Sequence, residues 1–185
     1  MAGLKFRVLL DTDNNTEIFR DILINDTDNF EVFYKAIIQA FNFQGDQMAS
    51  IYVSNDNWDK GFELNLMDMT YGDEQDETEA SIMKDVAIKT HLEEPDQKFI
   101  LVYDFMRMWI FLIELVGYEK EGPATPQVLV SVGMAPPEDS RAANDVDELF
   151  LGAYDAEEFD EDEDEFGDDF EDGYADEDYE NFDQY

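Results

Sequence analysis

The stretch FEVFYKAIIQAF, residues 30–41, sets the fold because its apolar residues recur with a helical period. Phe30, Phe33 and Tyr34 are followed by apolar residues seven, eight and eleven positions after Phe30, which is the spacing of one helix face. Thr27 or Asp28 is a suitable N-cap, and Gly45 ends the pattern. The spacing predicts an amphipathic helix over residues 29–43, whose apolar face must be covered.

The segments around this helix have the character of strands. Residues 4–10 alternate apolar with basic side chains, a turn cluster fills residues 11–15, and a second strand is predicted over residues 16–24. We expect these two to form an antiparallel hairpin. Beyond the helix, strands are predicted over residues 48–54 and 62–66.

The second half of the chain adds further strands. Residues 81–92 are predicted as a short second helix, although the β-branched residues there suit a strand equally well. Residues 99–104 and 109–119 are strongly apolar and are predicted to be adjacent central strands, with a last strand over residues 127–132. This order predicts an α+β fold, with an antiparallel or mixed sheet and two helices packed on one face.

Charge divides the chain into two parts. The net charge is -37, and 18 of the 48 acidic residues lie between Asp155 and Tyr185, where there is no Lys or Arg. The remaining 30 acidic and 11 basic residues leave the preceding part at -19. Like charges at this density repel one another and offer little surface to bury. We therefore predict a compact domain over residues 1–153 and a disordered acidic tail over residues 154–185.

Composition argues against several function classes. The absence of cysteine excludes thiol catalysis and cysteine-ligated metals, and His91 as the only histidine excludes a two-histidine site. The pattern Asp11-x-Asp13-x-Asn15 begins like a calcium loop, but Thr16 and Ile22 replace its required Gly and Glu. No cofactor or metal is predicted. The acidity disfavours direct binding to nucleic acid or membrane, and we expect a cytoplasmic protein.

Tyr103-Asp104-Phe105-x-x-x-Trp109 places a carboxylate inside an apolar run. We expect Asp104 to be buried and bonded to backbone or to a tyrosine, where it would hold the register of the sheet. The alternative is a carboxylate in a functional pocket.

The acidic tail carries aromatic residues at intervals, and these are the predicted partner-binding residues. Aromatic side chains are frequent anchors at protein interfaces, whereas acid alone would serve solubility. The alternative is a solubilising tail with incidental aromatics. The six residues are Phe159, Phe166, Phe170, Tyr174, Tyr179 and Phe182.

Three blocks together resemble a known family: residues 36–41, then Tyr103-Asp104-Phe105 with Trp109 and Ile113, then residues 135–139, which end in Glu138-Asp139. The chain is similar over residues 4–140 to the plasmid pRiA4b open-reading-frame-three-like family, with the tail outside that range. The resemblance implies a small bacterial or archaeal α+β protein, in some cases carried beside transposases, and implies no particular activity.

Departures from the family pattern fall on polar positions. The resemblance implies a histidine where this chain has Tyr34, another where it has Phe111, and a third near Gln47. It also implies Gly-Asp where this chain has Met106-Arg107. If these residues form a site in relatives, apolar side chains have replaced much of it here, which favours a binding scaffold over an enzyme.

The leading hypothesis is a non-enzymatic interaction protein whose acidic surface and tail bind a basic protein of a transcription, translation or transposition complex. One alternative is mimicry of nucleic acid by carboxylates of the folded part. The other is a metal-assisted hydrolase that uses Asp104, Glu138 and Asp139, with Glu114.

Overall fold

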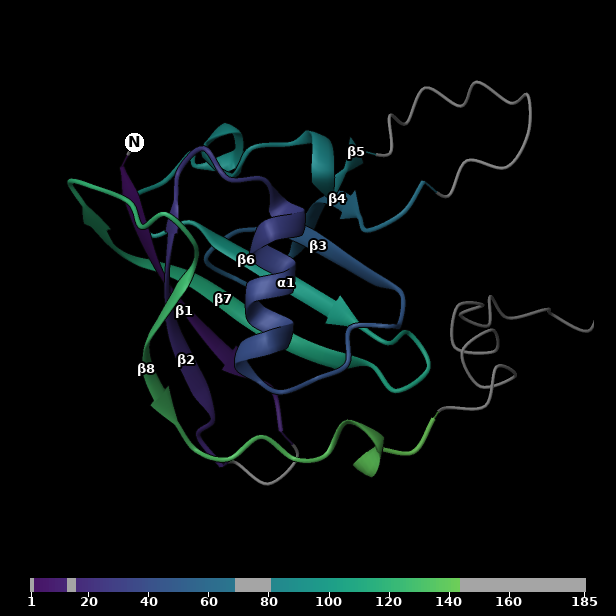
Figure 1. The fold of residues 1–185 in the computed structure, drawn as a ribbon. Helices are drawn as coiled ribbons and strands as arrows, with labels where there is room; N and C mark the ends of the chain where they lie inside the picture. Colours follow the sequence, from purple (N-terminus) through teal and green to yellow (C-terminus); the bar gives the residue numbers. More distant parts are fainter. Residues whose placement is uncertain (1, 13–15, 69–80, 144–185) are drawn as a thin grey trace, which may run out of the picture.

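The computed structural model describes residues 2–12, 16–68 and 81–143 as a strongly bent sheet with one α-helix across it (Figure 1). The elements in chain order are β1 Gly3–Leu10, β2 Phe19–Asn25, α1 Phe30–Ala40, β3 Ala49–Ser54, β4 Lys60–Asn65, β5 Ser81–Ile82, η1 Met83–Asp85, η2 Ile88–His91, β6 Lys98–Tyr103, β7 Trp109–Glu119, β8 Gln127–Val132 and η3 Glu138–Ser140. Two short 3₁₀ turns lie between β5 and β6, and a third follows β8.

The sheet has the strand order β5-β4-β3-β6-β7-β1-β2-β8. All neighbouring strands are antiparallel except β4 and β5, so the sheet is mixed. The predicted hairpin is confirmed, because Leu4 pairs with Ile24 and Leu9 with Phe19. The two predicted central strands are also neighbours, and β7 joins β6 to β1 in the middle of the sheet.

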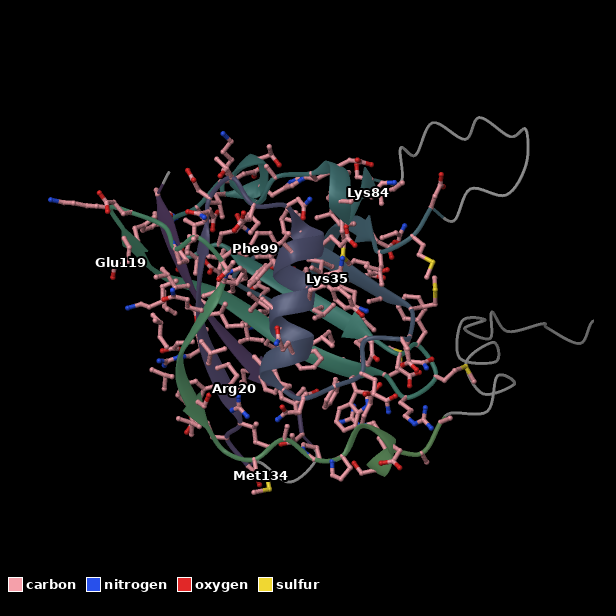
Figure 2. All side chains as sticks on the ribbon, in the orientation of Figure 1. Arg20, Lys35, Lys84, Phe99, Glu119 and Met134 are labelled. Carbon is pink, nitrogen blue, oxygen red and sulfur yellow. The ribbon has the colours of Figure 1, made fainter. Side chains whose placement is uncertain are left out.

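The core lies between α1 and the covered face of the sheet, as the period of residues 30–41 predicts. The rings of Phe6 and Phe33 lie 4.7 Å apart, and those of Phe30 and Phe99 lie 5.4 Å apart. Figure 2 labels Phe99 beside α1. All four side chains are fully buried. Each such burial contributes about 1.5–3 kcal/mol, so this aromatic layer is the main force that fixes α1 on the sheet.

The predicted second helix is wrong: residues 81–91 form β5 and two 3₁₀ turns instead, which leaves one α-helix in the described part of the chain. Besides the bonds within its 3₁₀ turns, the segment bonds to the start of α1. Phe30 donates its backbone N–H to the carbonyl of Val86, and Ile88 donates to the carbonyl of Asp28. These tertiary hydrogen bonds require an extended backbone around Val86, and they prevail over local helix propensity.

Arg20 joins the C-terminal end of α1 to the last two strands. Its guanidinium is buried and donates to the carbonyls of Phe19, Ala40, Val132 and Gly133 at 2.8–3.2 Å. Burial lowers the pKa of this group. Carbonyls at a helix C-terminus carry partial negative charge, so a cation is favoured there.

Several sequence predictions fall on residues that the structure does not describe. The predicted acidic tail over residues 154–185 lies there, with the domain boundary at residues 153–154. Within the described ranges, no helix is long and apolar enough to cross a membrane.

Candidate functional site

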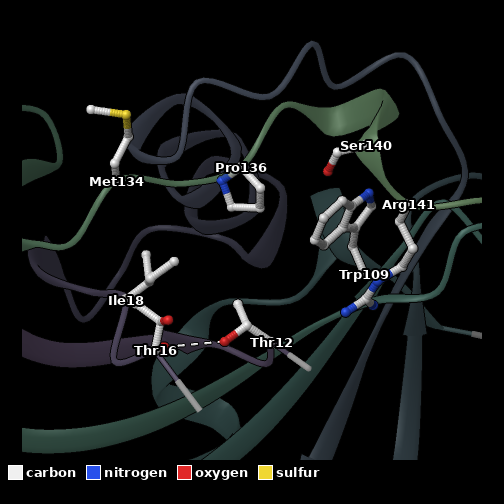
Figure 3. Close-up of a pocket in the computed structure, with 8 residues that line it drawn as sticks. All are labelled: Thr12, Thr16, Ile18, Trp109, Met134, Pro136, Ser140 and Arg141. Atoms are coloured by element: carbon white, nitrogen blue, oxygen red, sulfur yellow. Dashed lines mark hydrogen bonds between the residues drawn. The ribbon is translucent and has the colours of Figure 1, made fainter. Parts of the chain in front are cut away.

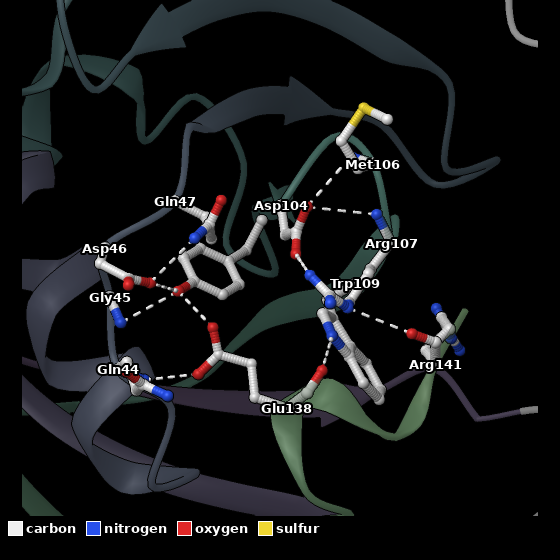
Figure 4. A network of polar contacts seen from close by, with 11 residues as sticks. Gln44, Gly45, Asp46, Gln47, Asp104, Met106, Arg107, Trp109, Glu138 and Arg141 are labelled. Carbon is white, nitrogen blue, oxygen red and sulfur yellow. Dashed lines mark hydrogen bonds and ion pairs between the residues drawn. The ribbon is translucent and has the colours of Figure 1, made fainter. Parts of the chain in front are cut away.

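The turn between β6 and β7 is built around Asp104. Its φ of 55° and the φ of 53° at Met108 are left-handed, a conformation that Asp tolerates better than most residues. The buried carboxylate accepts the backbone N–H groups of Met106 and Arg107 at 3.1 and 3.2 Å, and the Arg107 guanidinium at 2.9 Å (Figure 4). Asp104 therefore lies in a turn just past β6, not within a strand, and its partners are backbone and Arg107 rather than a tyrosine.

Tyr103 and Glu138 form the second part of the site. The Tyr103 hydroxyl is buried, donates to Glu138 Oε1 at 2.6 Å and accepts the backbone N–H of Gly45 at 3.0 Å. Glu138 Oε2 accepts the backbone N–H of Gln44 at 2.6 Å. One carboxylate in η3 thus joins the loop after α1 to the end of β6.

Trp109 and two arginines complete the arrangement. Trp109 Nε1 donates to the carbonyl of Glu138 at 3.1 Å, and the Arg141 guanidinium lies 4.4 Å from the centre of the Trp109 ring. Arg107 donates to the carbonyl of Arg141 at 3.2 Å, and Arg141 donates to the carbonyl of Met108 at 2.6 Å. We call Tyr103, Asp104, Arg107, Trp109, Glu138 and Arg141 the clasp, because they fasten residues 138–141 to the β6–β7 turn.

The electrostatics of the clasp favour neutral tyrosines and a charged Arg107. Burial and the neighbouring Glu138 raise the pKa of Tyr103, and burial with Glu138 and Asp46 raises the pKa of Tyr34 to about 12. The hydrogen bond that Arg107 donates to the Asp104 carboxylate raises the pKa of Arg107. Neither tyrosine is therefore poised to act as a base near neutral pH.

The positions where the resemblance implies histidine gather around Tyr103. The Tyr34 ring lies 6.3 Å from the Tyr103 ring, and its buried hydroxyl has no hydrogen-bond partner among the described residues. Phe111 packs on Phe43, which also contacts Tyr103. Gln47 donates to Asp46, whose carboxylate lies 3.5 Å from the Tyr103 hydroxyl. The three positions thus lie close together, and two of them hold aromatic residues of the core.

A cleft of about 360 Å³ lies beside the clasp, between it and the strand ends of β1 and β2 (Figure 3). The indole of Trp109 and the guanidinium of Arg141 form one side, and Met134 stands at the opposite side. The lining also includes hydroxyl groups. The lining residues are Thr12, Thr16, Ile18, Trp109, Met134, Pro136, Ser140 and Arg141.

The structure separates several of the predicted site residues. Tyr103, Trp109 and Glu138 come together, whereas Phe105 is half-buried beside them and Asp139 is exposed. Glu114 pairs in register with Lys98 at the far end of β6, so it lies away from Asp104. The six predicted aromatic residues of the tail lie outside the described part of the chain.

One group of carboxylates with metal-ligand spacing lies apart from the residues of the hydrolase alternative. Within the described residues, the carboxylates of Asp56, Glu94 and Asp96 are close enough to share an ion, and all three residues are exposed. Asp56 also accepts a salt bridge from Lys98. Asp104, Glu138 and Asp139 do not form such a group.

Sequence reasoning missed Arg107 and Arg141 as members of the site. One signal was available, because Arg141 is the last basic residue before a long acidic segment, and Arg107 is a rare charge within an apolar run. Gln44 and Gly45 contribute only backbone N–H groups, which residue types do not reveal.

Comparison with known proteins places the chain in a family. The family model described as "Plasmid pRiA4b ORF-3-like protein" matches residues 2–184, well beyond the range of 4–140 that the three blocks indicated, so the acidic segment lies within the match. No curated protein matches the chain.

A solved structure shares the fold. The crystal structure of MM3350, a protein of unknown function from Methanosarcina mazei Go1, is similar with a TM-score of 0.61 at 19% identity, and the match covers 76% of this chain and 75% of that one.

Proposed function

We propose, from the premise that the chain belongs to the plasmid pRiA4b ORF-3-like family, that it is a non-enzymatic interaction protein that binds a basic protein surface. The acidic segment, residues 154–185, and the acidic surface of the folded part make the contact. The observation that carries this proposal is the net charge of -37, with no Lys or Arg after Arg141.

The clasp supports a structural rather than a catalytic role for its polar residues. Both carboxylate oxygens of Glu138 accept hydrogen bonds, and those of Asp104 accept three. Carboxylates that are fully engaged within the protein stabilise a loop geometry and have little capacity left for a substrate. The clasp would then anchor the chain shortly before the acidic segment begins.

The partner is a protein that itself handles nucleic acid, such as a component of RNA polymerase, the ribosome or a transposase complex. Such proteins present basic surfaces, and an acidic chain complements them. High charge speeds the encounter, most strongly at low salt, and the tail aromatics then slow dissociation.

Two full-length variants test the proposal. In one, the 18 Asp and Glu residues from Asp155 to Tyr185 become Asn and Gln; in the other, the six tail aromatics become Ser. Affinity purification from the host, at two salt concentrations and with mass spectrometry, compares both with the parent chain. Circular dichroism confirms that each variant keeps the folded part.

We expect the neutralised variant to lose the basic partner. The aromatic variant should capture it at low salt and release it faster. Equal recovery of every partner by all three proteins at both salt concentrations would contradict the role of the acidic segment.

A second candidate is mimicry of nucleic acid by the folded part, which the exposed cluster of Asp56, Glu94 and Asp96 favours. The partner would then be held in a groove that normally binds a phosphate backbone. Neutralising these three residues while leaving the acidic segment intact should abolish competition with DNA for that groove. Unchanged competition would refute mimicry by this cluster. The hydrolase hypothesis gains no such support, because its carboxylates do not converge.

A further inference from the structure

Residues 122–137 are an uncharged segment in a highly charged protein. Charged residues make up 32% of the chain, yet these 16 positions contain none. β8 lies in the middle of the segment and contributes the exposed residues Val128, Leu129 and Val130, at 46, 47 and 41%. Exposed edge strands usually carry charges that prevent further pairing, and this one has none.

β8 is also the last strand of the sheet. It pairs with β2 on one side, and in the described part of the chain no strand pairs with its other side. The strand on the opposite edge, β5, has only two residues and is followed by η1, which contains the charged residues Lys84 and Asp85. The two edges therefore differ in length and in nearby charge, and β8 has by far the longer row of backbone groups open to pairing.

A groove of mixed polarity lies between α1 and the start of β8. Its volume is about 570 Å³, and its lining comes from α1, from Ile22 in β2 and from residues 125–128. Ile22 pairs with Val128 in register and forms part of the floor, and Ala36 and Ala40 face it from α1. Lys35 is the one charged residue of the lining, and it is bonded to Glu31. Through Ile22, Ala36, Ala40 and Val128, the groove can therefore receive apolar side chains from a strand that pairs beside the start of β8.

Acidic residues lie near both ends of β8, and the buried guanidinium of Arg20 lies at the C-terminal end, bonded to the carbonyls of Val132 and Gly133. Asn25 bonds to the carbonyl of Pro123 just before β8 and is followed by Asp26 and Asp28. At the other end, Gly133 lies against the backbone of Glu17. A segment with apolar residues at its centre and basic residues at its ends complements this arrangement in both polarity and charge.

A bulge limits the length of regular pairing. Asp21 pairs with Val130 and Ile22 with Val128, so Leu129 is an extra residue in β8. Bulges interrupt the regular ladder that a long partner strand needs. Together with the repulsion between two chains of charge -37, this argues against a second copy and for a short partner segment.

We propose that β8 is the docking edge for a short extended segment of the basic partner, with alternating apolar residues flanked by Lys or Arg. The segment adds a strand to the sheet and places apolar side chains in the groove beside α1. The requirement for basic flanks rests on the proposed function, whereas the edge and the groove do not.

The test uses the full chain and a synthetic peptide, Lys-Lys-Val-Thr-Val-Thr-Val-Lys-Lys, with a control in which the central Val is Pro. Amide hydrogen exchange and NMR shifts report where each peptide binds, and light scattering reports the mass of the protein alone. The variant Val130→Lys blocks the edge. Val116→Lys is its matched control, because Val116 in β7 has a similar exposure of 40%.

We expect exchange at β8 amides to slow at least tenfold at saturating peptide, with shifts at Ala36 and Ala40. The proline peptide should give no protection. Val130→Lys should weaken binding at least tenfold, and Val116→Lys should leave it unchanged.

Three outcomes would overturn the proposal: the absence of protection of β8 by the peptide, an equal loss of binding in the two lysine variants, or a dimer of the protein alone with protected β8 amides.

The neutralised variant of the acidic segment separates this inference from the proposed function. Protection of β8 that persists in this variant, together with unchanged partner capture, would refute the proposed function alone. Lost capture without any β8 protection by the peptide would refute the docking edge alone.

Discussion

The clasp and β8 differ in whether their polar groups are bonded within the chain. In the clasp, the side chains of Asp104, Tyr103 and Glu138 are bonded to groups of the same chain at 2.6–3.2 Å. Along β8 the side chains are apolar or uncharged and exposed, and one side of the backbone has no strand beside it in the described part.

The difference shows that a dense polar cluster is not in itself evidence of a binding site. The clasp looks like a site in sequence because it combines Tyr, Asp, Trp and Glu, but its geometry is that of a fastened loop. β8 looks unremarkable in sequence, and it is the structure that exposes it. Substitutions in the clasp should therefore lower the stability of the fold, whereas substitutions in β8 should weaken the binding of a partner.

The largest loss in the free energy of unfolding is expected for Asp104→Ala. It removes three hydrogen bonds to a buried carboxylate and places Ala at a φ of 55°, so we expect a loss of about 3 kcal/mol in the free energy of unfolding. Urea unfolding measures it. Asp104→Gly relieves the backbone strain without restoring the bonds and should recover about 1 kcal/mol. A loss below about 1 kcal/mol for Asp104→Ala would show that the clasp contributes little.

Tyr103→Phe should cost about 2 kcal/mol, because it leaves Glu138 Oε1 without a donor and the N–H of Gly45 without an acceptor. Its matched control is Tyr34→Phe, in the same cluster. The Tyr34 hydroxyl is buried without a partner among the described residues, so its removal should leave stability unchanged or raise it by up to about 1 kcal/mol. Equal losses for the two variants would mean that the bond to Glu138 is not what stabilises the clasp.

Alkaline pH should weaken the clasp. The pKa of Tyr34 is raised to about 12 and that of Tyr103 is raised as well, so the folded state favours the protonated forms. The stability that they contribute is complete below the unfolded pKa of about 10 and is lost as pH rises through the folded values. Unfolding measured between pH 8 and 11 should show this decline above pH 10. In Tyr34→Phe the decline should be shallower; an identical decline would contradict the assignment to Tyr34.

The smallest effect on stability is expected for Val130→Lys. The side chain is 41% exposed on an edge strand, so the free energy of unfolding should change by less than about 0.5 kcal/mol. A loss above about 1.5 kcal/mol would show that β8 is part of the stable core, and the contrast with the clasp would fail.

Sequence patterns predicted the parts of the fold that local periodicity controls. The helix, the first hairpin and the central strands follow from alternating or helical spacing of residues such as Phe30, Phe33 and Ile113. The second helix could not be excluded in this way, because its apolar residues fit either period. Hydrogen bonds from Phe30 and Ile88 to residues far along the chain decide its conformation.

The sequence indicated several residues of the site, but it did not indicate which groups they bond to. Tyr103, Trp109 and Glu138 were singled out, and they do meet. The turn at Asp104 was not visible, because a left-handed φ at an Asp leaves no mark in the hydrophobic pattern. Arg141 lies 34 residues from Arg107, and only the folded chain shows that they bond.

Arg20 gives the molecule an uneven resistance to pulling. Its guanidinium holds the carbonyls of Val132 and Gly133 at the C-terminal end of β8, close to the end of α1. Tension that enters from residues beyond Arg141 must first break the clasp and then these bonds before it reaches the strand itself. A partner that pulls on the acidic segment would thus strain the helix end before it peels the outer strand away.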